Sequence, residues 1–336
     1  MNKLTNCVKQ HKCLTIAIAL ILVGSVFGMV FNTSFFYVNV SRISFETERG
    51  TLHGLLYMPR GAGPNDPRPV IITTHGFLNS AEMQDAPAIE MSRRGYIVLA
   101  LDMYDHGNSR WAAPILVGGH FATFWIHSQF DAARYMFEQP FTLRDENGNG
   151  IIAVSGHSMG GFSSMVAVYF DEMNYLQTGY RMIHSAISVG ADLSHSSAVA
   201  PPDRLIPAMG PRTIGFVGGL YDEFFFNAPE AVAEAGGSVI RYDWTTHPVG
   251  QMLLGEPGTA NQWHWGESGD VIVDDAVVRE SMVGLRIIYT PAETHPWNHF
   301  SATTTGYLID FYYTAFAGHT SNVHRLRSVF EKAGHN

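Results

Sequence analysis

The sequence is nearly without cysteine. Its 336 residues include two cysteines, Cys7 and Cys13, and both lie close to the N-terminus. Because no thiol follows Cys13, the rest of the chain can form no disulfide, no thiolate metal site and no cysteine nucleophile. Any covalent chemistry in the body of the protein has to use another side chain.

Charge is also scarce, and clustered basic charge is absent after the first dozen residues. Charged side chains make up 15% of the chain, and the formal net charge is -9. Nucleic-acid phosphates bind clustered Lys and Arg, so we expect no nucleic-acid partner. Internal repeats and low-complexity tracts are lacking too. The hydrophobic content of 46% is sufficient for a sizeable core.

Neither of two possible metal signals forms a complete binding pattern. The 16 histidines show no HExxH motif and no recognisable ligand spacing. The segment Asp145 to Gly150, DENGNG, matches the first half of a calcium loop. Its twelfth position would be Gly156, where that loop needs a glutamate, so a polar turn is the better interpretation. We expect no metal and no cofactor.

One long uncharged segment stands near the N-terminus, at residues 14–31 (LTIAIALILVGSVFGMVF). At 1.5 Å per residue it would span about 27 Å, close to the hydrocarbon thickness of a bilayer. Three lysines precede it, namely Lys3, Lys9 and Lys12. The next charge is Arg42, so the positive-inside rule places residues 1–13 in the cytoplasm. We predict a single-pass signal anchor with the body of the protein outside the cytoplasm.

A cleaved signal peptide is the alternative interpretation of this segment. The apolar run is longer than a usual signal core, and the best cleavage candidate, Val26-Phe27-Gly28, is weak. Cleavage would make the protein secreted. The body is exported under either interpretation.

From Val38 onward, short apolar runs alternate with helical patterns, which is typical of a mainly parallel sheet. Eight runs are predicted as strands: VNVSRISFE, TLHGLLYMP, VIITTHG, YIVLALDM, IIAVSGHS, AISVGAD, TIGFVGG and LRIIYTP. The first two should pair antiparallel. The Val, Ile and Leu content of the others suits strands buried on both faces. Helices are expected at 81–94, 121–138, from about 159, at 229–235 and at 303–316.

The strongest motif is Gly156-His157-Ser158-Met159-Gly160-Gly161, which follows IIAVS and precedes a helical pattern. A serine hydroxyl is a weak nucleophile, and it becomes effective when a sharp strand-to-helix turn presents it to a base. The glycines two positions before and after Ser158 allow strand and helix to approach closely. The helix N-terminus offers the Met159 N–H and its dipole to a developing oxyanion. We therefore predict Ser158 as the nucleophile.

This motif and others in the same order resemble the α/β-hydrolase family over roughly residues 38–317. The segment His75-Gly76-Phe77 ends the run VIITT, and by the resemblance the Phe77 N–H would join that of Met159 as the second oxyanion donor. The segment 102–109, DMYDHGNS, resembles the loop after the family's next strand, in which His106 would be structural. The implied α/β-hydrolase fold is a mostly parallel eight-stranded sheet with helices on both faces, here preceded by one transmembrane helix.

The resemblance also implies an acid and a base. Asp222 follows TIGFVGG, where the family has the carboxylate that orients the histidine, and the adjacent Glu223 would point elsewhere. The base should follow LRIIYTP, where His295 and His299 compete. His295 has the family's distance from the strand, whereas His299 lies almost on the next helix because Ser301 resembles its N-cap. The predicted triad, in the chain order of this fold, is Ser158, Asp222 and His295.

These residues predict a serine hydrolase that cleaves a carboxylic ester or related small acyl substrate through an acyl-enzyme on Ser158. A peptidase or an acyltransferase on the same fold is an alternative, as is a non-catalytic binding protein. An insertion at about 238–283 is expected to form a hairpin on the rim of the catalytic face, and residues 318–336 are expected to form a C-terminal tail. The sequence identifies no substrate-binding residue and no oligomeric state.

Overall fold

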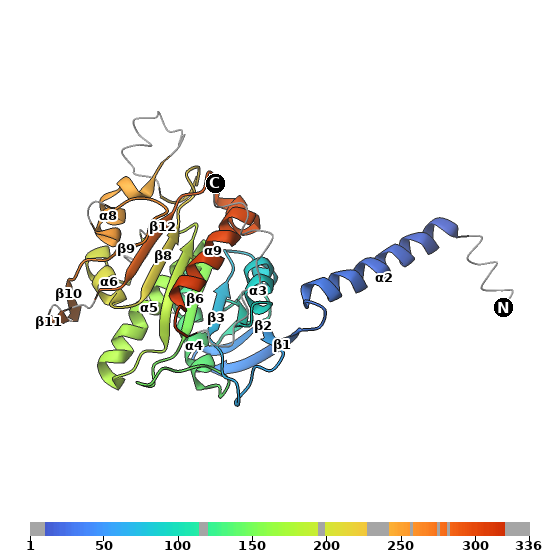
Figure 1. The fold of residues 1–336 in the computed structure, drawn as a ribbon, viewed down its shortest axis with the longest axis horizontal. Coiled ribbons are helices and arrows are strands. Elements are labelled where there is room, and N and C mark those ends of the chain that lie inside the picture. Colours follow the sequence, from blue (N-terminus) through green and yellow to red (C-terminus); the bar gives the residue numbers. More distant parts are fainter. Residues whose placement is uncertain are drawn as a thin grey trace.

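The computed structural model describes residues 11–113, 120–193, 199–226, 242–255, 258–273, 276–280 and 283–319. Three predicted segments fall wholly or mostly outside them: the cytoplasmic N-terminus at 1–13, the helix at 229–235 and the C-terminal tail at 318–336. The described part is a central sheet covered by helices, with one helix projecting from it (Figure 1).

The centre of the fold is a ten-stranded sheet in the order β1-β2-β4-β3-β6-β7-β8-β12-β9, with β5 paired to β2. The parallel strands are β3 (Val70–Thr74), β4 (Ile97–Asp102), β6 (Ile152–His157), β7 (Ile183–Val189), β8 (Thr213–Val217) and β12 (Leu285–Tyr289). Almost all of their side chains are buried, as the continuous apolar runs predicted. The mostly parallel sheet is confirmed.

An antiparallel hairpin closes one edge of this sheet. It consists of β1 (Val38–Thr47) and β2 (Gly50–Pro59), which confirms the predicted pairing. The strand β2 also pairs antiparallel with β4, with His53 opposite Asp102. Since β1 is antiparallel to β2 and β2 is antiparallel to β4, β1 runs in the same direction as β4. Asp102 ends β4 at the edge where the parallel strands end. Val38, which begins β1, therefore lies toward the opposite edge.

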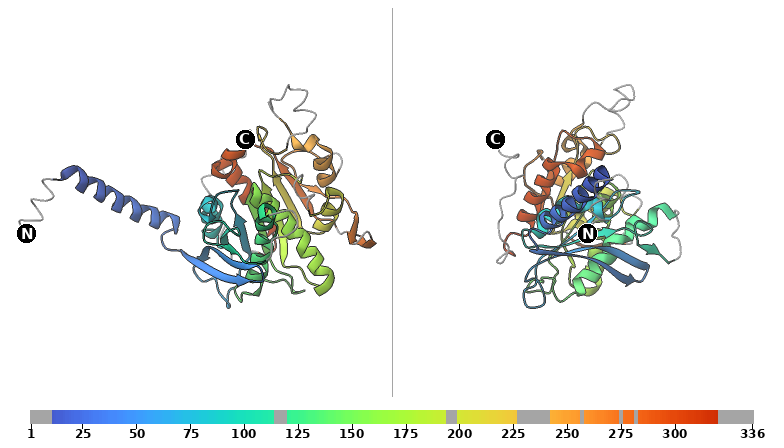
Figure 2. Two further views of the ribbon diagram at one scale, coloured as in Figure 1. Left: turned by 180° about the vertical axis from the view of Figure 1, so that it is seen from behind. Right: turned by 90° about the vertical axis from the view of Figure 1, so that its right-hand side faces the viewer.

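Helices cover both faces of the sheet (Figure 2). On one face lie α3 (Asp85–Ser92) and α9 (Ala302–Ala315), which bury Met91, Leu308 and Phe311 in one core cluster. The opposite face is covered by α4 (His120–Glu138), α5 (Met159–Thr178), α6 (Pro202–Met209) and α8 (Pro248–Leu254). The helix expected at 81–94 begins as the 3-10 helix η1 (Ala81–Gln84) before it becomes α3.

The sheet has more strands than the eight that were predicted. The additional strands are β5 (Arg110–Trp111), which pairs with β2, and β9 (His264–Trp265), which pairs with β12. Each contains two residues. Two residues are too few to show the alternation or apolar run by which a strand is recognised in a sequence.

The hairpin predicted in the insertion exists, but its predicted place was wrong. The strands β10 (Asp270–Val273) and β11 (Ala276–Glu280) pair antiparallel. Arg279 of β11 hydrogen-bonds Glu172, which lies toward the C-terminal end of α5. Since α5 begins where β6 ends and runs back along the sheet, the hairpin lies toward the opposite end from the rim of the parallel strands. Alternating residues predict a hairpin but contain no information about the edge on which it docks.

The projecting element is α2 (Lys12–Asn32), which contains the predicted segment 14–31. No residue of α2 is buried against the rest of the protein. The short segment 33–37 joins it to β1 (Figure 1). By length and composition α2 can cross a membrane, and a signal sequence would have the same properties.

Candidate active site

Ser158 lies at a sharp turn between β6 and α5, as its motif predicted. Its φ is 56° and its ψ is -116°, a strained conformation for a residue with a side chain. The Ser158 N–H donates to the carbonyl of Val189 at 2.8 Å, and the Ser158 carbonyl accepts the N–H of Phe162 at 3.1 Å. The serine is therefore held by the last pairing of β6 with β7 and by the first turn of α5.

The glycines on each side of Ser158 make this turn possible. A Cβ on Gly156 would lie 2.5 Å from the carbonyl carbon of Gly160, and a Cβ on Gly160 would lie 2.6 Å from the main-chain oxygen of Thr74. Real Cβ atoms do not approach other atoms this closely. The glycine spacing is therefore a packing requirement of β3, β6 and α5.

A buried glutamine that the sequence analysis overlooked braces the same turn. The Gln129 Nε2 donates to the Thr74 Oγ1 at 2.6 Å, to the Ser155 carbonyl at 2.9 Å and to the Gly160 carbonyl at 2.8 Å. Gln129 itself is fully buried on α4. A glutamine among the apolar core positions of a helix was the signal that could have revealed it.

Asp222 and His295 come together although 72 residues separate them in the chain. The His295 Nδ1 lies 2.9 Å from the Asp222 Oδ2, and both residues are buried. The Asp222 Oδ1 accepts the N–H groups of Phe224 at 2.9 Å and Phe225 at 2.8 Å. These bonds fix the carboxylate, so it can orient the imidazole.

Glu223 was expected to point elsewhere, but it also contacts His295. Its Oε2 accepts the main-chain N–H of His295 at 3.0 Å. The two loops are further joined by the Leu220 N–H, which donates to Pro291 at 2.8 Å, and the Tyr221 N–H, which donates to Glu293 at 3.1 Å. Hydrogen bonds therefore hold the loops after β8 and β12 together, and these loops position His295.

Ser158 and His295 lie at the same edge of the sheet, and the structure has no hydrogen bond between the Ser158 Oγ and the His295 ring. A Cβ on Gly190, which follows β7, would lie 3.2 Å from the His295 Nδ1. The residue before Gly190 is Val189, which accepts the Ser158 N–H. A serine–histidine bond in a hydrolase often tightens only when substrate binds.

The loop that begins with His75 passes beside the serine. A Cβ on Gly76 would lie 3.3 Å from the Ser158 Cβ. The His75 Nδ1 lies 2.6 Å from the Gly76 carbonyl, and its Nε2 accepts the Met103 N–H at 3.1 Å. Burial lowers the pKa of His75 to about 4, so the ring is neutral with its proton on Nδ1. This ring fixes the loop that contains Phe77, one of the two predicted oxyanion donors. The other, Met159, is the first residue of α5.

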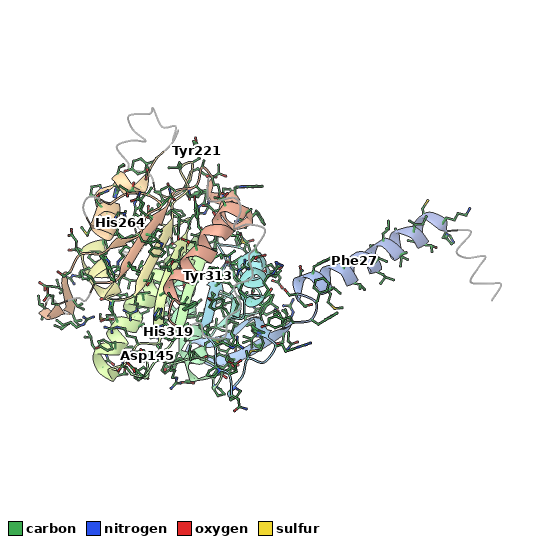
Figure 3. The ribbon with its side chains drawn as sticks, viewed as in Figure 1. Phe27, Asp145, Tyr221, His264, Tyr313 and His319 are labelled. Atoms are coloured by element: carbon green, nitrogen blue, oxygen red, sulfur yellow. The ribbon has the colours of Figure 1, made fainter. Side chains whose placement is uncertain are left out.

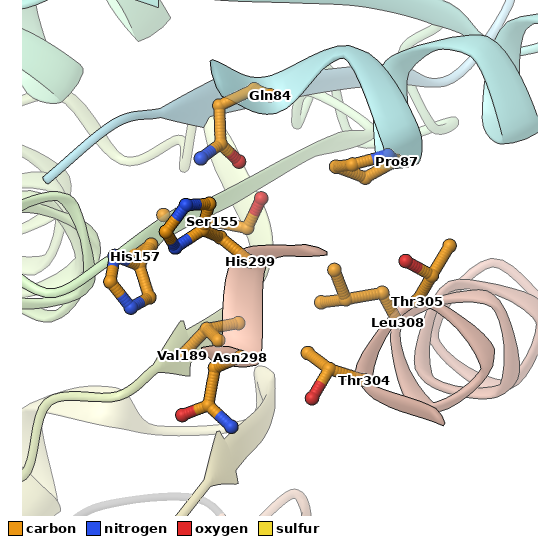
Figure 4. Close-up of a pocket in the computed structure, with 11 residues that line it drawn as sticks. Gln84, Pro87, Ser155, His157, Val189, Asn298, His299, Thr304, Thr305 and Leu308 are labelled. Atoms are coloured by element: carbon orange, nitrogen blue, oxygen red, sulfur yellow. The ribbon is translucent and has the colours of Figure 1, made fainter. Parts of the chain in front are cut away.

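His299, the other candidate for the base, makes no hydrogen bond to Asp222. It belongs to the 3-10 helix η4 (His295–Phe300) and contacts His157 at 4.8 Å between ring centroids. The two rings line a cavity of about 10 Å³ together with Ser155 and Gln84 (Figure 4). Burial and the nearby His295 lower the pKa of His299 to about 4.

Two other motifs from the sequence have structural surroundings. The Asp102 side chain accepts the N–H groups of Ala81 at 2.8 Å and Asn108 at 3.0 Å, which shapes the loop that contains His106. Asp145 accepts the N–H groups of Asn147 and Asn149, both at 2.8 Å, and so forms a polar turn. Asp145 lies at the opposite end of the molecule from Tyr221, which is next to Asp222 (Figure 3). In the described residues no group of three or more His, Cys, Asp and Glu side chains could hold a metal ion.

Comparison with known proteins finds one matching family model and many similar structures. The model of the serine aminopeptidase S33 family matches residues 65–205. No curated protein sequence matches. An esterase from Pyrobaculum calidifontis is 13% identical over 83% of this chain and 85% of its own, with a TM-score of 0.47. Est1E from Butyrivibrio proteoclasticus with ferulic acid bound is 17% identical over 82% of this chain and 99% of its own, with a TM-score of 0.49.

The matched residues 65–205 contain the Ser158 turn, the His75 loop and Gln129, and they end before Asp222 and His295. In the sheet, β3 and β7 lie on either side of β6, and the serine follows β6 at the carboxyl edge. The chain therefore has the α/β-hydrolase fold, and over residues 65–205 it is similar to the serine aminopeptidase S33 family.

Proposed function

We propose that the protein is a serine hydrolase that cleaves a carboxylic ester or a related acyl substrate. The observation that carries this proposal is the bond of 2.9 Å between Asp222 and His295, at the sheet edge where Ser158 occupies a strained strand-to-helix turn. A fold alone does not define an activity. A serine, a histidine and a fixed carboxylate at one edge support a specific chemistry, acyl transfer through the serine.

In this reaction His295 accepts the Ser158 proton while the Ser158 Oγ attacks the substrate carbonyl. Asp222 holds the proton on His295 Nδ1, which leaves Nε2 for the serine, and it stabilises the imidazolium without being protonated. The imidazolium then protonates the leaving alcohol. Water, activated by the same ring, hydrolyses the acyl-enzyme and restores Ser158.

The N–H groups of Phe77 and Met159 would bind the oxyanion. The first follows Gly76, whose Cβ position is 3.3 Å from the Ser158 Cβ, and the second opens α5. Both are main-chain donors on rigid elements, and the α5 dipole adds partial positive charge. An oxyanion donor of this kind contributes about 3–4 kcal/mol to catalysis.

The surroundings of the site favour an apolar ester. Large apolar side chains are exposed on the loops after β3, β8 and β12, namely Phe77, Leu78, Phe224, Trp297 and Phe300. The nearby carboxylates Asp192, Asp222 and Glu223 each accept a main-chain N–H. A peptidase that recognises a free amino terminus would need a carboxylate to bind that ammonium group. These three carboxylates already bind main-chain N–H groups of the protein itself, which favours the ester.

A peptidase is nevertheless the second candidate, because the matching family model is that of a serine aminopeptidase. A panel of p-nitrophenyl esters of increasing acyl length, run beside aminoacyl p-nitroanilides, separates the two. We expect turnover of esters that disappears in Ser158→Ala. Turnover of anilides alone would favour the peptidase, and no turnover of either would contradict the hydrolase proposal.

We also propose that α2 anchors the enzyme with its catalytic domain outside the cytoplasm. The support is the length and apolar character of α2, together with the three lysines that precede the residues 14–31. The short segment 33–37 would then hold the catalytic domain close to the membrane surface.

A further inference from the structure

The residue before the serine, His157, makes a hydrogen bond to the loop of the proposed base. Its Nε2 lies 3.0 Å from the main-chain oxygen of His295, and the side chain is 4% exposed. A carbonyl oxygen only accepts, so the His157 Nε2 carries the hydrogen. Burial, with His295 and His299 adjacent, lowers the pKa of His157 to about 3, so the ring is neutral.

Close packing fixes the position of this imidazole. A Cβ on Gly76 would lie 3.2 Å from the His157 Nδ1, and a Cβ on Gly190 would lie 3.2 Å from its Nε2. The ring centroids of His157 and His295 are 4.7 Å apart. The imidazole therefore occupies the space that a side chain on either glycine would need.

His295 is held at three points, and they have different origins. Its ring bonds Asp222 and its main-chain N–H bonds Glu223, both on the loop after β8. Its main-chain carbonyl accepts from His157 on β6, the strand that ends at Ser158. Of these three bonds, the one from His157 joins the base directly to the strand of the nucleophile.

A histidine at this position lowers the stability of the protein in a way that a phenylalanine would not. The His157 Nδ1 is buried and has no hydrogen-bond partner in the structure. A buried polar atom without a partner costs about 1–3 kcal/mol. The adjacent cavity of about 10 Å³ has room for one water (Figure 4). What the imidazole gains over phenylalanine is the bond from Nε2 to His295.

We propose that His157 is a positioning residue, which sets the distance between Ser158 and His295 through its bond to the His295 carbonyl. This inference rests on the proposed function, and it adds a residue to that site. Displacing a base by about 1 Å costs about 100-fold in rate. Loss of the bond should therefore reduce catalysis more than substrate binding.

The test uses the full chain in detergent with three variants. His157→Phe keeps a flat ring and removes the donor, whereas His157→Gln keeps an N–H near the position of Nε2. His184→Phe is the control, because His184 is a half-buried histidine that lies on β7 at the end of the sheet away from the serine. For each variant, kcat and KM are measured on a soluble ester, per active site titrated with a fluorophosphonate.

We expect His157→Phe to lower kcat by about 10- to 100-fold with KM within about twofold, and His157→Gln to recover most of the loss. His184→Phe should keep the wild-type kcat per titrated site. A wild-type kcat in His157→Phe, or an equal loss in His157→Phe and His157→Gln, would overturn the positioning role. If the proposed function were wrong, the result would be different. The wild type itself would then neither turn over ester nor react with the fluorophosphonate, and both proposals would fall.

Discussion

At the scale of single residues, Gln129 shows how one buried amide can hold several segments together. Its Nε2 donates to oxygens of Thr74, Ser155 and Gly160, which belong to β3, β6 and α5. In Gln129→Leu these acceptors lose their shared donor in the core. We expect the variant to lose roughly 1–3 kcal/mol of unfolding free energy, measured by urea denaturation.

A second glutamine, directly after the end of the same helix, provides the control. Gln139 is only partly buried and donates to the Tyr135 carbonyl at 2.9 Å. Gln139→Leu should change the unfolding free energy by less than about 0.5 kcal/mol. Equal stability of Gln129→Leu and wild type would show that the brace contributes nothing.

The residues that were predicted from the sequence differ from those that were missed in one physical respect. Ser158 is marked by the glycines beside it, and Asp222 and His295 each follow a recognisable apolar strand. By contrast, Gln129 and Glu223 act through bonds to main-chain atoms far away in the sequence. A polar residue at a core position, such as Gln129, can be noticed in the sequence, but the main-chain atoms to which it bonds are visible only in three dimensions.

At the scale of elements, the approach of β3, β6 and α5 depends on Gly160. A Cβ there would lie 2.4 Å from the Thr74 Oγ1 and 2.6 Å from the Thr74 main-chain oxygen. Because a main-chain atom cannot move away easily, Gly160→Ala should displace the turn. We expect it to lower the free energy of unfolding by about 3 kcal/mol and to abolish the reactivity of Ser158. Thermal unfolding and the rate of fluorophosphonate labelling measure the two effects.

Gly63 is the matched control for this substitution. No atom lies within 4 Å of the position of its Cβ. Gly63→Ala should keep the unfolding temperature and labelling rate of the wild type. If Gly160→Ala behaved like Gly63→Ala, close packing would not explain the glycine.

The elements were predicted well where they are long and periodic. The strand β6 and the helix α5 follow from a buried apolar run and a helical pattern on either side of Ser158. The two-residue strand β9 was missed, and the hairpin of β10 and β11 was placed at the wrong end of the sheet. Its position depends on the bond of Arg279 to Glu172, a tertiary contact between segments 107 residues apart.

At the scale of the whole molecule, neutral histidines that are buried or half-buried make stability depend on pH. Burial is the main cause that lowers the pKa of His157 to about 3 and of four others to about 4, namely His75, His127, His184 and His299. Between pH 6.5 and about 4 the unfolded chain therefore binds more protons than the folded one. Stability should fall as pH falls through this window.

Thermal unfolding from pH 7.5 to 4 measures this decline. Burial raises the pKa of Asp131 and of Asp171, so these carboxyls bind protons in the folded state and oppose part of the loss near pH 4. His184→Phe should flatten the decline, because it removes one of the histidines. An unfolding temperature that stays constant between pH 6.5 and 4.5 would contradict the expectation.

The whole molecule also includes α2, whose side chains are exposed to solvent in the absence of a membrane. We predict that the full chain stays in the membrane fraction during alkaline extraction. Replacing Leu20 and Ile21, which are 67% and 66% exposed, by arginine should release it, since each charge costs about 3 kcal/mol in a bilayer. A mature N-terminus after Gly28 would instead establish a cleaved signal.

The most direct test of the central claim is fluorophosphonate labelling of the full chain, with the labelled residue identified by mass spectrometry. Wild type, Ser158→Ala, His295→Ala and His299→Ala are compared. We predict label on Ser158, none in Ser158→Ala, a loss of at least about 100-fold in rate in His295→Ala, and near wild-type labelling in His299→Ala. Folded wild-type protein that takes no label, or labelling that depends on His299 rather than His295, would contradict the account.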